Sequence, residues 1–159
     1  MNRKNLLSLI AAAGLLACAH GAANAQASPT CAAADGMVTI NYFRTAGDYD
    51  NWGTHLWESF EKVDDGKITA AKTKSDQPLS GIAWTSPMKP SGKSDFGVCW
   101  QVKADEFRNT KVNFIVHKGD SKDCSKDTAF FTTQGKEVFV NQGDCTVFFS
   151  KDDAVKARK

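Results

Sequence analysis

The sequence predicts an all-β protein, a single antiparallel β-sandwich of the immunoglobulin-like kind. Short apolar and β-branched segments alternate with turns rich in Gly, Asp and Asn, and no long stretch shows the period of an amphipathic helix. No internal repeat or long linker divides the chain, so we expect one domain over residues 36–150. Residues 26–35 are expected to be an N-terminal lead, and residues 151–159 a tail that is a short helix or disordered.

The first part of the predicted sandwich is a strand, a polar turn and a second strand. The segment Met37–Phe43 is apolar and β-branched, as strands are. Residues 47–51 combine Gly, Asp and Asn, which tolerate the backbone angles of turns. Residues 52–57 are predicted to form the second strand.

Alternation places the side chains of this second strand. Since successive strand residues point to opposite faces, an inward Leu56 implies that Thr54 and Trp52 also face the core. His55 and Trp57 then share the outer face, about 7 Å apart. Two flat rings side by side on a solvated face suit a flat, repeating ligand whose units have apolar faces.

Further strands are predicted downstream. They cover residues 96–102, 111–117, 129–133, 137–140 and 145–150. The apolar run at 111–117 indicates a central strand, and the segments at 129–133 and 137–140 are expected to pair as a hairpin. Phe96, Val98, Trp100 and Val102 share one face, which predicts a core position for Trp100.

The N-terminal 25 residues are predicted to be a secretory signal peptide. Arg3 and Lys4 form a positive start, residues 6–17 form an apolar run too short to cross a membrane, and Ala23-Asn24-Ala25 is a small-x-small cleavage site. Cleavage there gives a mature chain that begins at Gln26 and is secreted or periplasmic. The alternative is a membrane-anchored lipoprotein, because Leu15-Leu16-Ala17-Cys18 resembles a lipobox in which Cys18 is lipidated.

Four cysteines remain in the mature chain under either reading. They are Cys31, Cys99, Cys124 and Cys145. An even number in an exported chain predicts two disulfides, and no two of the four have the CxxC spacing of a zinc site. Three pairings are possible, of which we favour Cys31–Cys99 with Cys124–Cys145.

Charge and motifs exclude several function classes. Removing the signal removes its two positive charges, so the formal net charge falls from +2 to 0, which disfavours nucleic acid as a partner. The acidic segments at 48–50 and 64–66 lack calcium-loop spacing, and HExxH, G-x-S-x-G and phosphate-loop motifs are absent from the sequence. His55 has no evident catalytic partner, and a small sandwich offers little room for a glycosidase cleft. We therefore expect no enzyme activity, metal or cofactor.

Two motifs together carry a resemblance to a known family. Tyr42-Phe-Arg-x-x-Gly-Asp-Tyr-Asp-x-Trp-Gly-x-His-Leu-Trp57 is followed by Lys111-Val-x-Phe-Ile-Val-His-Lys-Gly-Asp-x-Lys-Asp123. In order and spacing, they resemble the pullulanase-associated carbohydrate-binding module, family forty-one, over roughly residues 36–150. The resemblance implies a module that binds starch-like α-glucans or maltooligosaccharides and has no catalysis of its own.

The resemblance also implies which residues form the site. Glucose units would stack on His55 and Trp57, while Lys122 and Asp127 hold hydroxyl groups. Some members carry a further loop Trp where Gly119 or Asp120 stands here, and Trp84 is the candidate to replace it. A catalytic partner would then be a separate glycoside hydrolase. The alternative function is an exported protein-binding module, such as a hydrolase inhibitor that has lost sugar binding.

Overall fold

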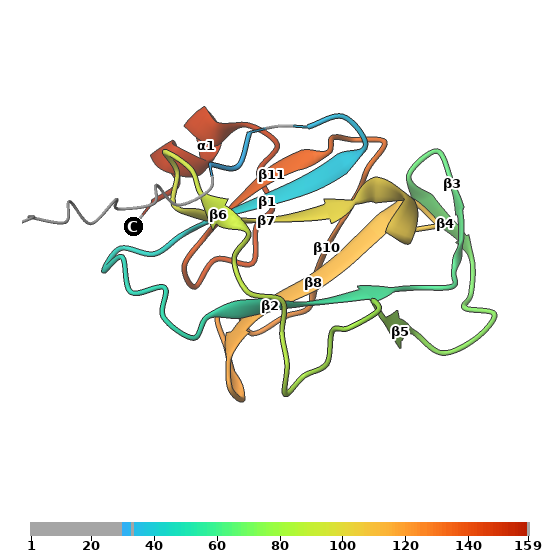
Figure 1. Ribbon diagram of the computed structural model, residues 1–159. Coiled ribbons are helices and arrows are strands. Elements are labelled where there is room, and N and C mark those ends of the chain that lie inside the picture. Colours follow the sequence, from blue (N-terminus) through green and yellow to red (C-terminus); the bar gives the residue numbers. More distant parts are fainter. Residues whose placement is uncertain (1–29, 33, 159) are drawn as a thin grey trace, which may run out of the picture.

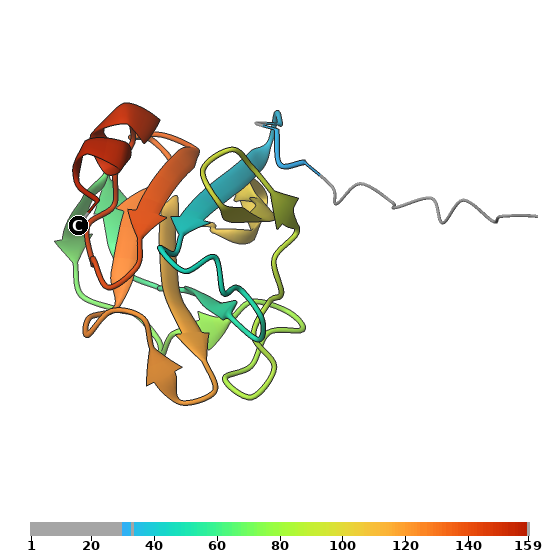
Figure 2. The ribbon, with the colours of Figure 1, turned by 90° about the vertical axis from the view of Figure 1, so that its left-hand side faces the viewer.

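The computed structural model describes residues 30–32 and 34–158, which form two β-sheets packed face to face (Figure 1). The predicted signal peptide, the lipobox at Cys18 and the mature start at Gln26 lie outside the described residues. Turned by 90°, the molecule shows a short helix, α1 (Lys151–Lys156), against the first sheet (Figure 2). Among the described residues, no helix is long and apolar enough to cross a membrane.

The first sheet has the strand order β11-β1-β7-β6. Its strands are β1 (Met37–Phe43), β6 (Gly92–Lys93), β7 (Val98–Lys103) and β11 (Glu137–Asn141). β1 is central, antiparallel to β7 and parallel to β11. A 3₁₀ turn, η1 (Ala104–Glu106), follows β7 within the connection to the second sheet.

The second sheet has the order β10-β8-β2-β5, and it carries the outward rings. Its strands are β2 (Gly53–Glu58), β5 (Gln77–Pro78), β8 (Lys111–Lys118) and β10 (Thr128–Phe131), with β9 (Ser121–Lys122) paired to β8. A separate hairpin is formed by β3 (Lys62–Asp64) and β4 (Lys67–Ala70). The predicted sandwich is confirmed, and so is the central position of the strand at 111–117.

Side chains from both sheets fill the space between them. Trp100, Tyr42 and Leu56 are fully buried there, which confirms the core positions predicted for Trp100 and Leu56. Trp52 is half-buried against the same core, and the Arg44 guanidinium lies 3.9 Å from the centroid of its ring. A second apolar cluster lies outside the first sheet, where Phe139 of β11 packs with Ala154 of α1.

The hairpin predicted for 129–133 and 137–140 is wrong, because the two strands belong to different sheets. β10 pairs with β8, whereas β11 crosses over and pairs in parallel with β1. Phe130 enters the core from the second sheet, and Val138 and Val140 enter it from the first. The connection between β10 and β11 therefore links the two sheets. Alternation within a strand shows which residues face the core but not which strand is its neighbour.

Two smaller predictions are also wrong. Residues 145–150 do not form a strand, since only Phe148 makes a β-bridge, to Phe139, before Ser150 caps α1. Phe96 does not share the face of Val98. Gly97 passes so close to β1 that a Cβ would collide with the Tyr42 carbonyl oxygen, and Phe96 turns into the outer cluster.

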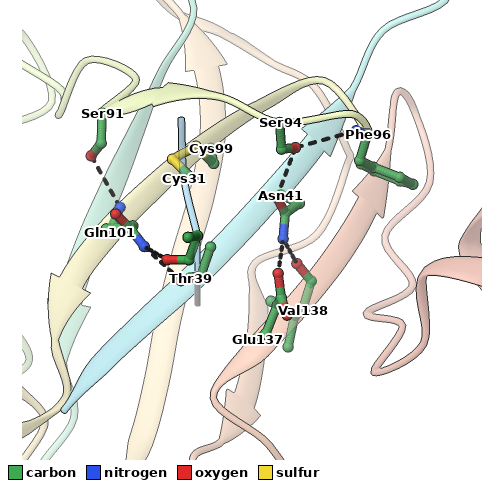
Figure 3. Close-up of a disulfide and its surroundings, with 11 residues drawn as sticks. Cys31, Thr39, Asn41, Ser91, Ser94, Phe96, Cys99, Gln101, Glu137 and Val138 are labelled. Atoms are coloured by element: carbon green, nitrogen blue, oxygen red, sulfur yellow. Dashed lines mark hydrogen bonds between the residues drawn. A yellow bond between two sulfur atoms is a disulfide. The ribbon is translucent and has the colours of Figure 1, made fainter. Parts of the chain in front are cut away.

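The four cysteines form two disulfides, Cys31–Cys99 and Cys124–Cys145, which is the favoured pairing. The first fixes the N-terminal segment to β7, beside a polar network on the outside of the sheet (Figure 3). In that network, Ser94 donates to the Asn41 side chain, which donates to Glu137 (Figure 3). The second disulfide fixes the loop after β9 to the segment that follows β11.

Candidate functional site

Two rings lie on the outer face of the second sheet, where strand alternation places them. Thr54 and Leu56 of β2 are fully buried, whereas His55 and Trp57 between and after them are half-exposed. The centroids of the His55 and Trp57 rings are 5.8 Å apart, and their planes are tilted by 32°. His55 pairs across the sheet with Ile115 of β8, so the Ile115 side chain lies beside the His55 ring on the same face.

A third ring reaches this face from the loop between β5 and β6. Trp84 stacks on His117 of β8, with centroids 4.1 Å apart and planes 8° from parallel. Its indole Nε1 donates to Asp120 Oδ1 at 2.9 Å, and its ring lies 5.8 Å from that of His55. The loop carrying Trp84 and the β8–β9 hairpin project together beneath the second sheet (Figure 1).

Residue size explains why this loop can lie against the sheet. Gly53 pairs with His117, and a Cβ at Gly53 would come within 2.8 Å of Pro87 Cγ. A glycine at this register position therefore leaves room for the segment that follows Trp84. His117 is fully buried below it, and its Nδ1 lies 2.7 Å from the Gly119 carbonyl oxygen, a contact that requires the proton on Nδ1.

All five residues predicted to bind glucan line one shallow hollow of about 350 Å³. Its lining consists of His55, Trp57, Asp76, Pro78, Trp84, Ile115, Lys122 and Asp127. We call this hollow the ring platform. Lys122 Nζ lies 3.1 Å from Asp127 Oδ1 and 5.9 Å from the centroid of the Trp84 ring. Ionic and aromatic groups thus meet in one place, although they come from separate strands and loops.

The charges of the platform favour a neutral ligand. Burial, and then the proximity of His117, lowers the pKa of His55, so the ring is uncharged near pH 7. Lys122 and Asp127 offset one another. Asp76 accepts a hydrogen bond from Lys72 Nζ at 2.6 Å through one oxygen, and its other oxygen is buried without a partner among the described residues.

Sequence reasoning missed four residues of this region. Ile115 and His117 could have been found from strand alternation. They lie one and three residues after Phe114, so an inward Phe114 places both on the outer face of the sheet. Asp76 and Pro78 carry no such signal, since β5 is only two residues long and has no period to read.

A buried network holds the loop that contributes Lys122. Asp123 Oδ1 accepts from the Tyr42 hydroxyl at 2.6 Å and from Arg44 Nη1 at 3.2 Å, and its Oδ2 accepts from the Gly143 backbone at 2.9 Å. Burial, and then the hydrogen bond to Asp123, raise the pKa of Tyr42, which keeps the phenol protonated as a donor. Together with the Cys124 disulfide, these contacts fix the loop to the first sheet.

The site offers stacking surfaces and hydrogen-bonding groups. Across residues 30–32 and 34–158, no group of three or more His, Cys, Asp or Glu side chains could hold a metal ion. The arrangement can therefore bind a ligand that has both apolar faces and hydroxyl groups.

Comparison with known proteins places this geometry in context. The family model described as "Bacterial pullanase-associated domain" matches residues 36–149. An alpha-amylase of Streptomyces lividans is 26% identical over 93 residues, which cover 58% of this chain and 8% of the amylase. The chain thus spans a small part of that relative.

Solved structures share the fold. PulA from Klebsiella oxytoca matches with a TM-score of 0.58 and 22% identity, covering 79% of this chain and 12% of PulA. Klebsiella pneumoniae pullulanase complexed with maltotriose matches with a TM-score of 0.56 and 20% identity over 79% of this chain and 12% of its own. A structure of streptococcal family 41 carbohydrate-binding modules, described for alpha-glucan recognition, matches with a TM-score of 0.50 and 22% identity over 74% of this chain and 49% of its own.

Proposed function

We infer that this chain, which belongs to the bacterial pullulanase-associated domain family, is a non-catalytic module that binds α-glucans. The observation that carries the proposal is the ring platform, where Trp57, His55 and Trp84 gather beside Lys122 and Asp127. The similar streptococcal modules recognise alpha-glucan, and the similar pullulanase was solved with maltotriose. Both descriptions agree with what the platform can hold.

The chemistry of stacking explains the choice of ligand. The C–H faces of a glucose unit are apolar and pack on an indole, which presents a large apolar contact and a negative face. Two coplanar rings would suit a flat chain. A tilt of 32° between His55 and Trp57 instead suits a chain that turns from one unit to the next, as an α-1,4-linked glucan does.

The ion pair beside the rings supplies hydrogen bonds. Each sugar hydroxyl donates and accepts, so an ammonium and a carboxylate side by side satisfy both roles. The side chains of Lys122 and Asp127 are 40% and 61% exposed, which leaves room for hydroxyls at both groups. Charge-assisted hydrogen bonds of this kind are stronger than neutral ones.

Trp84 supports glucan binding over the protein-binding alternative. That alternative rested partly on the loop Trp that some family members carry where Gly119 or Asp120 stands here. In this chain, Asp120 accepts the Trp84 indole hydrogen bond, so a ring from another loop stands over this position. We therefore propose that Trp84 is the third aromatic wall.

The chain is further proposed to act outside the cytoplasm. Disulfides persist in oxidising compartments, and both disulfides here join distant parts of the fold. A secreted or periplasmic module with a cleaved signal, and a lipoprotein anchored through Cys18, remain the two forms of this proposal. Its functional partner would be a glycoside hydrolase that acts on the same glucan.

Affinity electrophoresis in gels containing amylopectin tests the proposal. Replacing a central aromatic anchor with Ala costs about 2 kcal/mol or more, so Trp57→Ala is expected to weaken binding roughly 30-fold. Ile68→Ala is the control, because Ile68 is also apolar and 50% exposed but lies on β4, outside the platform. Wild-type protein that is not retarded by amylopectin, or a folded Trp57→Ala variant retarded equally, would contradict the proposal.

A further inference from the structure

A second hollow lies next to the ring platform and shares Trp84 with it. It is an open groove of about 980 Å³ between the turn at 49–53, the loop at 84–93 and the tip of the β8–β9 hairpin at 119–120. We call it the loop groove. It exceeds the platform in volume, and the sequence motifs assign it no role.

The loop groove begins where the ring platform ends. Trp84 lines both hollows. Asp120, which accepts the Trp84 indole hydrogen bond, lines the groove as well. A polymer lying on the rings therefore meets the groove mouth as it passes Trp84.

The groove lining combines apolar rings with polar groups of both signs. Its apolar walls come from Tyr49, Trp52, Pro87 and Pro90. Its polar side chains are those of Asp50, Asn51, Thr85, Ser86, Lys89, Ser91, Lys93 and Asp120. The formal charges of its two carboxylates and two ammonium groups cancel, so the groove does not favour a ligand of either charge. A neutral ligand with apolar faces and many hydroxyls matches this lining, as it matches the platform.

The walls of the groove are held in place without a ligand. Thr54 and Met88 exchange backbone hydrogen bonds of 3.0 and 2.9 Å, which pin the 84–93 loop to β2. Trp100 Nε1 donates to the Met88 carbonyl oxygen at 2.9 Å, and this ties the same loop to the core. A preformed groove costs less ordering entropy on binding than a flexible one.

We propose that one α-glucan chain occupies both hollows, running from the ring platform past Trp84 into the loop groove. This inference rests on the proposed function and adds an extended subsite to it. Its consequence is selectivity for long glucan chains over short maltooligosaccharides, because short chains fill the platform alone.

Isothermal titration with maltotriose and maltoheptaose tests the extension. Maltoheptaose contains about five trisaccharide registers, so more frequent encounter alone raises its affinity roughly five-fold over maltotriose. Added groove contacts are expected to raise the ratio to roughly 50-fold, since two further hydrogen bonds together contribute about ten-fold.

A matched pair of variants separates the groove from the platform. Asp50→Ala/Lys89→Ala removes two exposed groove groups and should return the ratio to roughly five-fold with maltotriose affinity unchanged. Asp64→Ala/Lys67→Ala changes the same charges on the β3–β4 hairpin and should keep the wild-type ratio. In ¹H–¹⁵N spectra, the Trp52 indole signal should shift with maltoheptaose and not with maltotriose.

The outcomes distinguish this inference from the function on which it rests. If maltotriose binds and the affinity for maltoheptaose is only roughly five-fold higher, the extension is overturned and the platform proposal stands. A full gain that survives in Asp50→Ala/Lys89→Ala, with an unmoved Trp52 signal, would also overturn it. A protein that binds neither sugar overturns both proposals.

Discussion

Two aspartates in one loop should affect different properties when each is replaced by Asn, one the stability of the fold and the other the affinity for glucan. Asp123 is buried, with a side chain 7% exposed, whereas Asp127 is 61% exposed. Asp123 contacts the first sheet through Tyr42 and Arg44, whereas Asp127 pairs with Lys122 beside the rings. We expect Asp123→Asn to lower stability and Asp127→Asn to lower glucan affinity.

The contacts of Asp123 set the size of the effect. In Asp123→Asn, the amide NH₂ would face the Gly143 N–H, so this hydrogen bond is lost, at a cost of about 1 kcal/mol. Arg44 also loses a buried counter-charge, and breaking a buried ion pair costs about 3–5 kcal/mol. Arg44 keeps Asp48 at 2.8 Å, which reduces the net loss to about 3 kcal/mol. For a domain of this size, that is a fall of roughly 10 °C in Tm.

Thermal unfolding followed by circular dichroism at pH 7 measures both variants. Asp127→Asn removes an exposed pair worth about 0–1 kcal/mol, so its Tm should fall by no more than roughly 3 °C. The double variant Arg44→Met/Asp123→Asn should be less destabilised than the sum of its single changes, because it removes both buried charges. An Asp123→Asn Tm within roughly 2 °C of wild type, or below it by less than that of Asp127→Asn, would refute the reasoning.

Two further predictions concern pH and the disulfides. Because the folded-state pKa of His55 is lowered, the unfolded chain binds its proton more readily, so stability should fall as the pH drops below about 6.5. His55→Gln should flatten this part of the pH–Tm curve, and an unchanged slope would count against it. Cys124→Ser/Cys145→Ser opens a bridge with a sequence separation of 21 residues and should cost about 3 kcal/mol and weaken glucan binding. Cys31→Ser/Cys99→Ser, with a separation of 68, should cost about 4 kcal/mol yet leave the affinity of the folded protein unchanged, which equal affinity losses in both variants would contradict.

The parts of the fold that could be predicted from sequence are those that a local period encodes. Alternation placed Leu56 inward and Trp57 outward, and the same rule identified Trp100 as core. Partner choice has no such period. β10 and β11 both present apolar residues to the core, but they do so from opposite sheets, and a short intervening segment looks the same in either arrangement.

The candidate site likewise contains residues that strand alternation places and residues that only long-range contacts place. His55 and Trp57 are neighbours on one strand, so their shared face follows from counting residues. Trp84 is held by His117 and Asp120, which lie more than 30 residues away in sequence, and its own loop has no regular geometry. Only the three-dimensional contacts bring its ring to the platform.

This division has a physical consequence for how the site can vary. The rings on β2 cannot move without shifting the register of a central part of the sheet, which would turn Leu56 to solvent. Trp84 depends on one stack and one hydrogen bond, so changes in its loop can move or remove it while the sandwich stays intact. Trp84 also stands between the ring platform and the loop groove. Substitutions in this loop should therefore alter the length of glucan that is bound before they alter whether glucan is bound at all.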